Sequence, residues 1–74
     1  MVDPRALLQE LRGALREAGL TAANELNVLC ETAVGQRPAM LMALDSLSDA
    51  AAQRLRDLVQ RRLKGEPLQY IAGS

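Results

Sequence analysis

The chain has 74 residues, nine Lys and Arg against nine Asp and Glu, and no His, Phe or Trp. This length accommodates one small domain that buries only roughly 60% of its unfolded surface, and without large aromatic residues we expect a stability on the order of 3–5 kcal/mol. The zero formal net charge argues against a nucleic-acid-binding protein and against binding to an anionic membrane.

Hydrophobic residues recur with the helical period along the chain. Asp3 and Pro4 are typical of a helix start, and Gly19 is expected to end a first helix with apolar positions at Leu7, Leu8, Leu11, Ala14, Leu15 and Ala18. Thr21 is expected to cap a second helix ending at Gly35, with one apolar stripe formed by Leu26, Leu29, Cys30 and Ala33.

The second half of the chain predicts two further helices and a final turn. Pro38 opens a short third helix through about Leu44. Ser48 caps a longer helix that closes at 64–65, with one face marked by Ala51, Leu55, Leu58, Val59, Arg62 and Leu63. One more short turn is expected over 68–72. Because no segment alternates with period two, the predicted fold is all-α, a compact bundle of four to five short helices with antiparallel neighbours.

Residue types that commonly carry catalysis are mostly missing. The absence of His removes the commonest general base near neutral pH and the commonest metal ligand. A single Cys cannot build a zinc site, and the five glycines are too far apart to form a phosphate-binding loop. We therefore expect no catalytic, cofactor-binding or metal-binding residue in this sequence.

Cys30 has two interpretations. As a nucleophile it would need an electropositive neighbour, whereas Glu25 and Glu31 would raise the pKa of its thiol. As a small buried hydrophobic residue it fits the stripe of the second helix, and we favour this interpretation. One unpaired Cys favours a reducing compartment, and the charged N-terminal sequence resembles neither a signal peptide nor a membrane span. We expect a cytoplasmic protein.

Charged residues gather on two predicted helices. On the first helix, a solvated surface is the favoured interpretation of Glu10, Arg12, Arg16 and Glu17. On the fourth helix, the basic cluster consists of Arg54, Arg56, Arg61, Arg62 and Lys64. In one interpretation, this cluster is a solvated helix end whose positive charge complements the helix dipole. In the other, Arg61 and Arg62 bind an acidic or carbonyl-bearing surface of a partner, or they connect this domain to another one.

The C-terminal segment raises a similar choice. Gly65 can end the fourth helix in the left-handed conformation, and Pro67 starts the chain in a new direction. Three apolar or amphipathic side chains follow, Leu68, Tyr70 and Ile71. They either fold back and complete the bundle or contact another domain, and the phenol oxygen of Tyr70 needs a partner if it is buried.

This segment resembles a known family. The order Arg-Arg, two residues, Gly-Glu-Pro-Leu, one residue, Tyr-Ile, one residue, Gly is similar to the end of the N-terminal helical domain of the release-factor glutamine methyltransferases, the HemK/PrmC family. The matching residues are Arg61, Arg62, Gly65, Glu66, Pro67, Leu68, Tyr70, Ile71 and Gly73. The sequence departs from the family pattern over 25–30 in the second helix and at 38–39, where the third helix begins.

The resemblance implies a division of labour. Family members transfer a methyl group from S-adenosylmethionine to the glutamine of the Gly-Gly-Gln loop of peptide-chain release factors, and their cofactor loop and Asn-Pro-Pro-Tyr motif belong to the following domain. It thus predicts a helical bundle domain at 1–66, and at 67–74 a short helical turn with the start of a linker to a C-terminal methyltransferase domain. The bundle is expected to dock the release factor as a monomer without catalysing the reaction alone. Expected partner or interdomain contacts are Arg61, Arg62, Glu66 and Tyr70.

Three other interpretations fit the same residues. An independent helical adaptor with no enzymatic domain would also be a neutral amphipathic bundle. A helix-turn-helix DNA-binding protein would use 48–64 as its recognition helix, although the neutral charge disfavours it. A free-standing folding unit without a function of its own is the third possibility.

Overall fold

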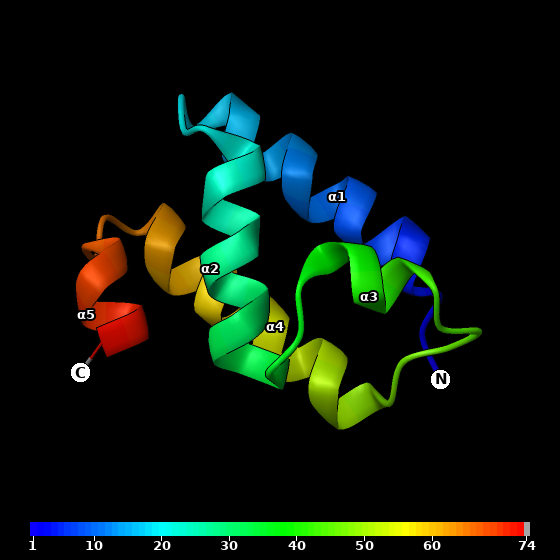
Figure 1. Ribbon diagram of the computed structural model, residues 1–74. Coiled ribbons are helices and arrows are strands. Elements are labelled where there is room, and N and C mark those ends of the chain that lie inside the picture. The colour runs from blue at the N-terminus through cyan, green and yellow to red at the C-terminus, as the bar shows by residue number, and fades with distance from the viewer. Residues whose placement is uncertain (74) are drawn as a thin grey trace.

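A computed structural model of the chain describes residues 1–73. Within this range there are five helices, namely α1 (Pro4–Glu17), α2 (Ala22–Val34), α3 (Pro38–Met42), α4 (Asp49–Leu63) and α5 (Leu68–Gly73) (Figure 1). The strand-type pairing in the described range is one isolated antiparallel bridge between Val2 and Leu47. The all-α prediction is therefore confirmed. None of these helices is long and apolar enough to cross a membrane.

The helices begin and end largely where the sequence predicts. The Asp3 carboxylate accepts a hydrogen bond from the backbone N–H of Arg5 at 3.1 Å, and the Ser48 hydroxyl accepts one from Ala51 at 3.1 Å. Thr21 occupies the N-cap position of α2, but its side chain makes no capping hydrogen bond. Three helix ends are followed by glycines with positive φ, Gly19, Gly35 and Gly65.

The third helix is shorter than predicted. It ends at Met42 rather than near Leu44. The N–H groups of Ala43 and Leu44 donate to carbonyls three residues earlier, at 3.2 and 3.1 Å. This tighter 3₁₀-type pattern closes the last turn and does not continue an α-helix.

The core is built around α2, which contacts each of the other four helices and crosses in front of α4 (Figure 1). The predicted stripe of α2 is fully buried. On α4 the buried residues are Ala52, Leu55 and Val59, whereas Ala51, Leu58, Arg62 and Leu63 are only half-buried. The apolar residues of the predicted face therefore all pack on the core, but the prediction missed the buried Ala52. Helical periodicity gives the direction of a buried stripe and not its width.

Polar contacts join the N-terminal region to α4. The backbone of Val2 exchanges two hydrogen bonds with that of Leu47, at 2.9 and 2.8 Å, just before α4 begins. Arg56 on α4 forms an ion pair with Glu10 on α1. Glu10 is exposed, as predicted, but it also joins α1 to α4.

Candidate interdomain and partner site

The turn between α4 and α5 has the geometry of a Schellman motif. The N–H of Gly65 donates to the carbonyl of Arg62 at 3.1 Å, and the N–H of Glu66 donates to the carbonyl of Arg61 at 3.2 Å. This path requires a φ of 103° at Gly65, which a residue with a Cβ rarely adopts. The turn brings Glu66 back over the last turn of α4.

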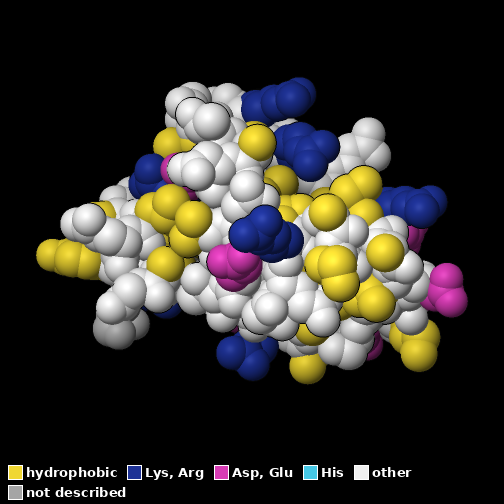
Figure 2. All heavy atoms as spheres, viewed as in Figure 1, with side chains coloured by type: hydrophobic (Ala, Val, Ile, Leu, Met, Phe, Trp, Pro, Cys, Tyr) yellow, Lys and Arg dark blue, Asp and Glu magenta, His cyan; other side chains and the backbone are white. Residues whose placement is uncertain are grey.

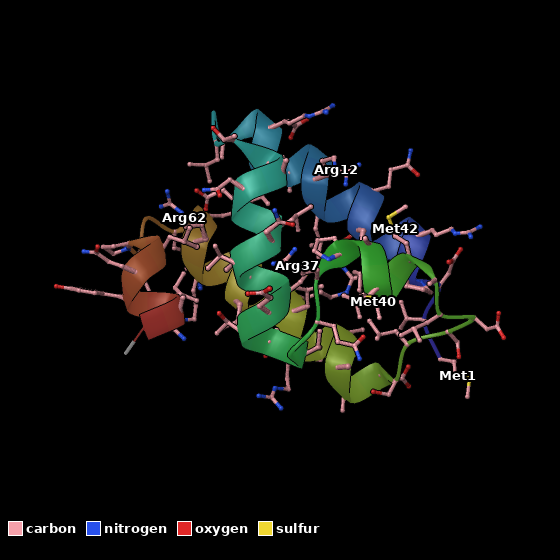
Figure 3. The ribbon with its side chains drawn as sticks, in the orientation of Figure 1. Met1, Arg12, Arg37, Met40, Met42 and Arg62 are labelled. Atoms are coloured by element: carbon pink, nitrogen blue, oxygen red, sulfur yellow. The ribbon has the colours of Figure 1, made fainter. Side chains whose placement is uncertain are left out.

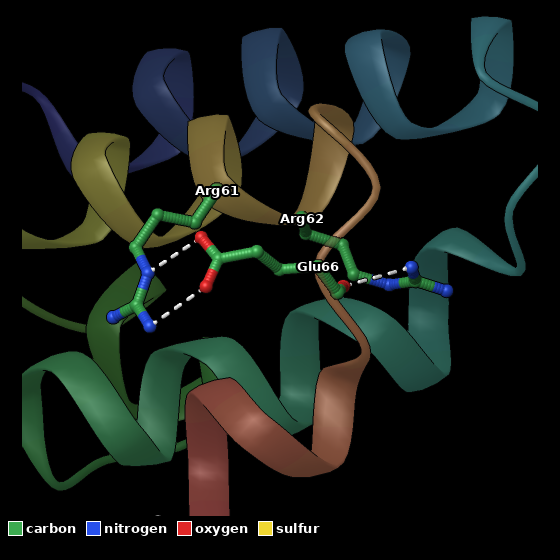
Figure 4. A network of polar contacts seen from close by, with 3 residues as sticks. All are labelled: Arg61, Arg62 and Glu66. Carbon is green, nitrogen blue, oxygen red and sulfur yellow. Dashed lines mark hydrogen bonds and ion pairs between the residues drawn. The ribbon is translucent and has the colours of Figure 1, made fainter.

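Arg61 and Glu66 form a bidentate ion pair across this turn (Figure 4). The Nε of Arg61 donates to Oε2 of Glu66 at 2.9 Å, and a terminal guanidinium nitrogen donates to Oε1 at 3.0 Å. The hydrogen bond from Arg61 lowers the pKa of the Glu66 carboxyl, and the same bond raises the pKa of Arg61. Because both side chains are exposed, the pair adds little to the free energy of unfolding. Its main effect is to orient Glu66 relative to the last turn of α4.

Arg62 occupies a more enclosed position. Its Nε donates to Oε1 of Glu25 on α2 at 2.8 Å, and its terminal nitrogen donates to the backbone carbonyl of Glu66 at 3.2 Å (Figure 4). The Glu25 and Arg62 side chains are 10% and 21% exposed. Arg62 therefore links α2, α4 and the segment that enters α5.

The Tyr70 side chain forms no hydrogen bond with these three residues. The N–H groups of Tyr70 and Ile71 donate to the carbonyl of Pro67 at 3.0 and 3.3 Å, forming the first turn of α5. This turn buries Ile71 in the core and leaves Tyr70 64% exposed, so its phenol oxygen is accessible to water. The structure thus brings Arg61, Arg62 and Glu66 together, whereas the exposed Tyr70 side chain is not hydrogen-bonded to them. Leu68 is half-buried against the core.

The sequence profile described as PrmC N-terminal domain matches residues 6–73. The chain belongs to the PrmC N-terminal domain family. Neither the curated proteins nor the solved structures contain a significant match. The resemblance carried by the C-terminal segment is therefore confirmed, and the match extends over all five helices.

In this PrmC N-terminal domain, the arginines already bind groups of their own chain. The carboxylate of Glu66 and the carbonyl of Glu66 are held by Arg61 and Arg62 respectively, and the carboxylate of Glu25 is also held by Arg62. Chemically, this arrangement fixes the direction in which the chain leaves α4. Contact of these residues with a partner or a further domain stays a prediction, as does the boundary at 66–67. Ser74, at the end of the predicted linker, lies outside the described residues.

Sequence reasoning missed the role of Glu25. It was considered only as a neighbour of Cys30, yet it is buried and forms the ion pair with Arg62. A signal was present in the helical spacing, because Glu25 falls on the same stripe as Ala22, Leu26, Leu29, Cys30 and Ala33. A carboxylate on an apolar stripe predicts a basic partner from another helix.

Cys30 is fully buried, which confirms its structural interpretation. Burial raises the pKa of its thiol to about 11. The sequence-based explanation, repulsion by Glu25 and Glu31, was wrong about the cause. Both carboxylates are engaged elsewhere, Glu25 by Arg62 at 2.8 Å and Glu31 by Arg37 at 3.1 Å.

No described residues form a group that suits a metal, since no three His, Cys, Asp or Glu side chains cluster within 1–73. A depression of about 250 Å³ lies between α2 and α4, lined by Thr32, Ala33, Arg54, Asp57 and Leu58. Its volume is below the roughly 300–1,000 Å³ of small-molecule pockets.

Proposed function

We propose that this chain is the N-terminal substrate-recognition domain of an S-adenosylmethionine-dependent protein-(glutamine-N5) methyltransferase. The domain docks a peptide-chain release factor so that the glutamine of its Gly-Gly-Gln loop is modified, and it is not catalytic alone. The observation that supports this proposal is the family match over residues 6–73. S-adenosylmethionine binds to the following methyltransferase domain, and the protein acts as a cytoplasmic monomer.

The chemistry of the reaction gives such a domain a purpose. An amide nitrogen is a poor nucleophile, so its methylation depends on holding the glutamine in line with the methyl donor. Contacts far from the reacting atoms can supply this positioning, provided that the contacting domain is itself held firmly relative to the catalytic domain.

The connection after α4 supports this role. The Schellman turn at Gly65, the bidentate pair of Arg61 with Glu66, and the bonds from Arg62 fix how α5 lies on the bundle. Within the proposal, α5 leads to the methyltransferase domain and the exposed Tyr70 contacts that domain. A firm connection transmits the position of the docked release factor to the catalytic site.

The test compares the parent enzyme with a variant that lacks residues 1–73. Methylation of an intact release factor and of a short free peptide containing Gly-Gly-Gln is measured for both. We expect the deletion to lower kcat/KM for the release factor by at least about tenfold, or about 1.4 kcal/mol, and to leave the peptide unaffected. Equal losses for both substrates would show that the bundle only stabilises the enzyme.

The alternative is an independent helical adaptor with no enzymatic domain. The coding sequence downstream of the Ser74 codon distinguishes the two. About 200 further codons, the length of one ordinary domain, with a glycine-rich loop after a strand and an Asn-Pro-Pro-Tyr motif would exclude the adaptor. A stop codon directly after Ser74 would instead exclude the enzyme.

A further inference from the structure

An apolar surface lies on and after α3, and we call it the α3 surface. It consists of Met40, Met42 and Leu44, which are 59%, 38% and 42% exposed. Figure 2 shows hydrophobic side chains gathered over α3, and Figure 3 shows Met40 and Met42 extending from this helix. Leu41, between the two methionines, is buried in the core.

Folding alone does not account for this composition. Pro38 and Leu41 already anchor α3 to the core. Met40, which is 59% exposed, could therefore be polar with little loss of packing, whereas Met42, at 38% exposed, is partly covered by the protein. Methionine side chains are flexible and polarisable, and they are frequent at surfaces that bind other proteins. A cluster of exposed apolar residues with charged residues at its margin often marks an interaction site. Single exposed apolar residues are common on any protein surface and do not.

Arginines form the margin of the α3 surface on the α1 side. Arg5, Arg12 and Arg16 recur at i, i+7 and i+11, which places them on one face of α1. The Nε of Arg5 donates to the carbonyl of Met42 at 3.3 Å, so this face borders α3. Arg12 follows about 10 Å further along the helix, above α3 in Figure 3.

Arg5 and Arg12 have no carboxylate partner within 1–73, and the same is true of Arg16 and Arg54. Arg5 donates instead to the backbone carbonyl of Met42, and Arg12 is half-buried. Asp45, which is exposed, follows Leu44 directly in the sequence. A partner carboxylate is therefore favoured next to Arg5 and Arg12 and disfavoured next to Asp45.

We propose that the α3 surface binds the protein substrate through an apolar segment flanked by acidic side chains. The inference rests on the proposed function and names the surface and the chemistry that perform it. The methionines contact the apolar side chains of the partner, and Arg5 and Arg12 bind its carboxylates. The absence of net charge, and of an aromatic residue among Met40, Met42 and Leu44, favours a protein partner over a nucleic acid.

The position of the α3 surface suits this role. It lies beside the N-terminal region, while α5 lies on the opposite side of α2 (Figure 1), in a molecule 31 Å long. A methyltransferase domain attached after α5 would leave the α3 surface accessible. Substrate and catalytic domain can then contact the bundle at the same time.

The experiment titrates the ¹⁵N-labelled chain with a bacterial-type release factor and compares three variants. We expect shifts at α3 and along the arginine face of α1. Met40→Glu should weaken binding at least about tenfold, the effect of losing a central contact. Arg12→Gln should weaken it severalfold and reduce its salt dependence. The control is Tyr70→Glu, which introduces the same charge at an exposed side chain on α5. This variant should bind the release factor as tightly as the unmodified chain does.

Two results would overturn the inference, and they have different consequences for the proposed function. If the release factor binds but only Tyr70→Glu weakens binding, the α3 surface is not the docking site, although the proposed function stands. If millimolar release factor causes no shift, the proposed docking function fails and the inference fails with it. Should Met40→Glu lose its dispersed spectrum, Met40→Gln replaces it, with weaker binding expected for the same reason.

Discussion

Removing the Arg62 side chain tests the enclosed part of the α4–α5 connection. The substitution Arg62→Ala leaves the Glu25 carboxylate, 10% exposed, without its partner. It also removes the donor to the backbone carbonyl of Glu66. Breaking a buried pair costs about 3–5 kcal/mol, and the 21% exposure of Arg62 lets water reach the vacated space. We therefore expect a loss of about 2 kcal/mol.

This loss is large for so small a domain. It amounts to about half of the 3–5 kcal/mol expected for a bundle of this size and composition. Since 1 kcal/mol shifts the Tm of a 60–100-residue domain by about 4–8 °C, the variant should melt about 8–16 °C lower. Thermal and urea unfolding followed by far-UV circular dichroism measures both quantities.

Two further variants show whether the pair itself is responsible. Arg54→Ala removes an exposed arginine of the same helix that forms no ion pair among the described residues, and it should change stability by less than about 0.5 kcal/mol. The double variant Glu25→Leu with Arg62→Met removes both charges and should recover most of the loss. If Arg62→Ala were as stable as Arg54→Ala, the pair would contribute nothing and the reasoning would be refuted.

Three further predictions concern α5, the exposed ion pair and the buried thiol. Ile71→Ala should cost about 2 kcal/mol and remove hydrogen-exchange protection from α5, since Ile71 is its buried residue; Tyr70→Ala should change stability by less than about 0.5 kcal/mol, and equal effects would contradict the packing. Arg61 lowers the pKa of Glu66, so the small stabilisation from this exposed pair is present at neutral pH and lost as the pH falls through the lowered pKa. Glu66→Gln should remove that part of the acid dependence in urea unfolding, and an unchanged pH profile would argue against it. Burial raises the pKa of Cys30 to about 11, so a thiol reagent at about pH 8 should label it only after unfolding; rapid labelling of the native chain would contradict its burial.

Helix boundaries could be predicted from the sequence because local chemistry decides them. Asp3 and Ser48 provide capping oxygens, and the three glycines after α1, α2 and α4 supply positive φ values. These effects act over one turn and need no knowledge of tertiary structure. The end of α3 was less predictable, because the sequence near Ala43 contains neither a glycine nor a proline that would stop a helix.

Contacts between distant residues could not be predicted in this way. Glu25 and Arg62 are 37 positions apart, and they meet only because α2 crosses α4. The same crossing decides that Ala52 is buried and that Leu58 is only half-buried. Helical periodicity identifies an apolar stripe but gives neither its width nor the helix that covers it.

The structure also separates two roles that the C-terminal motif appeared to combine. Arg61, Arg62, Gly65 and Glu66 carry the family resemblance, and each has an intrachain role in ending α4 and directing α5. Geometry within the bundle is thus sufficient to explain these residue types. Side chains that bind a partner need not belong to the motif that identifies the family. The α3 surface combines three exposed apolar side chains with Arg5 and Arg12, which have no carboxylate partner within 1–73. α3 packs on α1 and α2, whereas α5 packs on α2 and α4. The residues of the proposed docking surface can therefore change without altering the connection after α4.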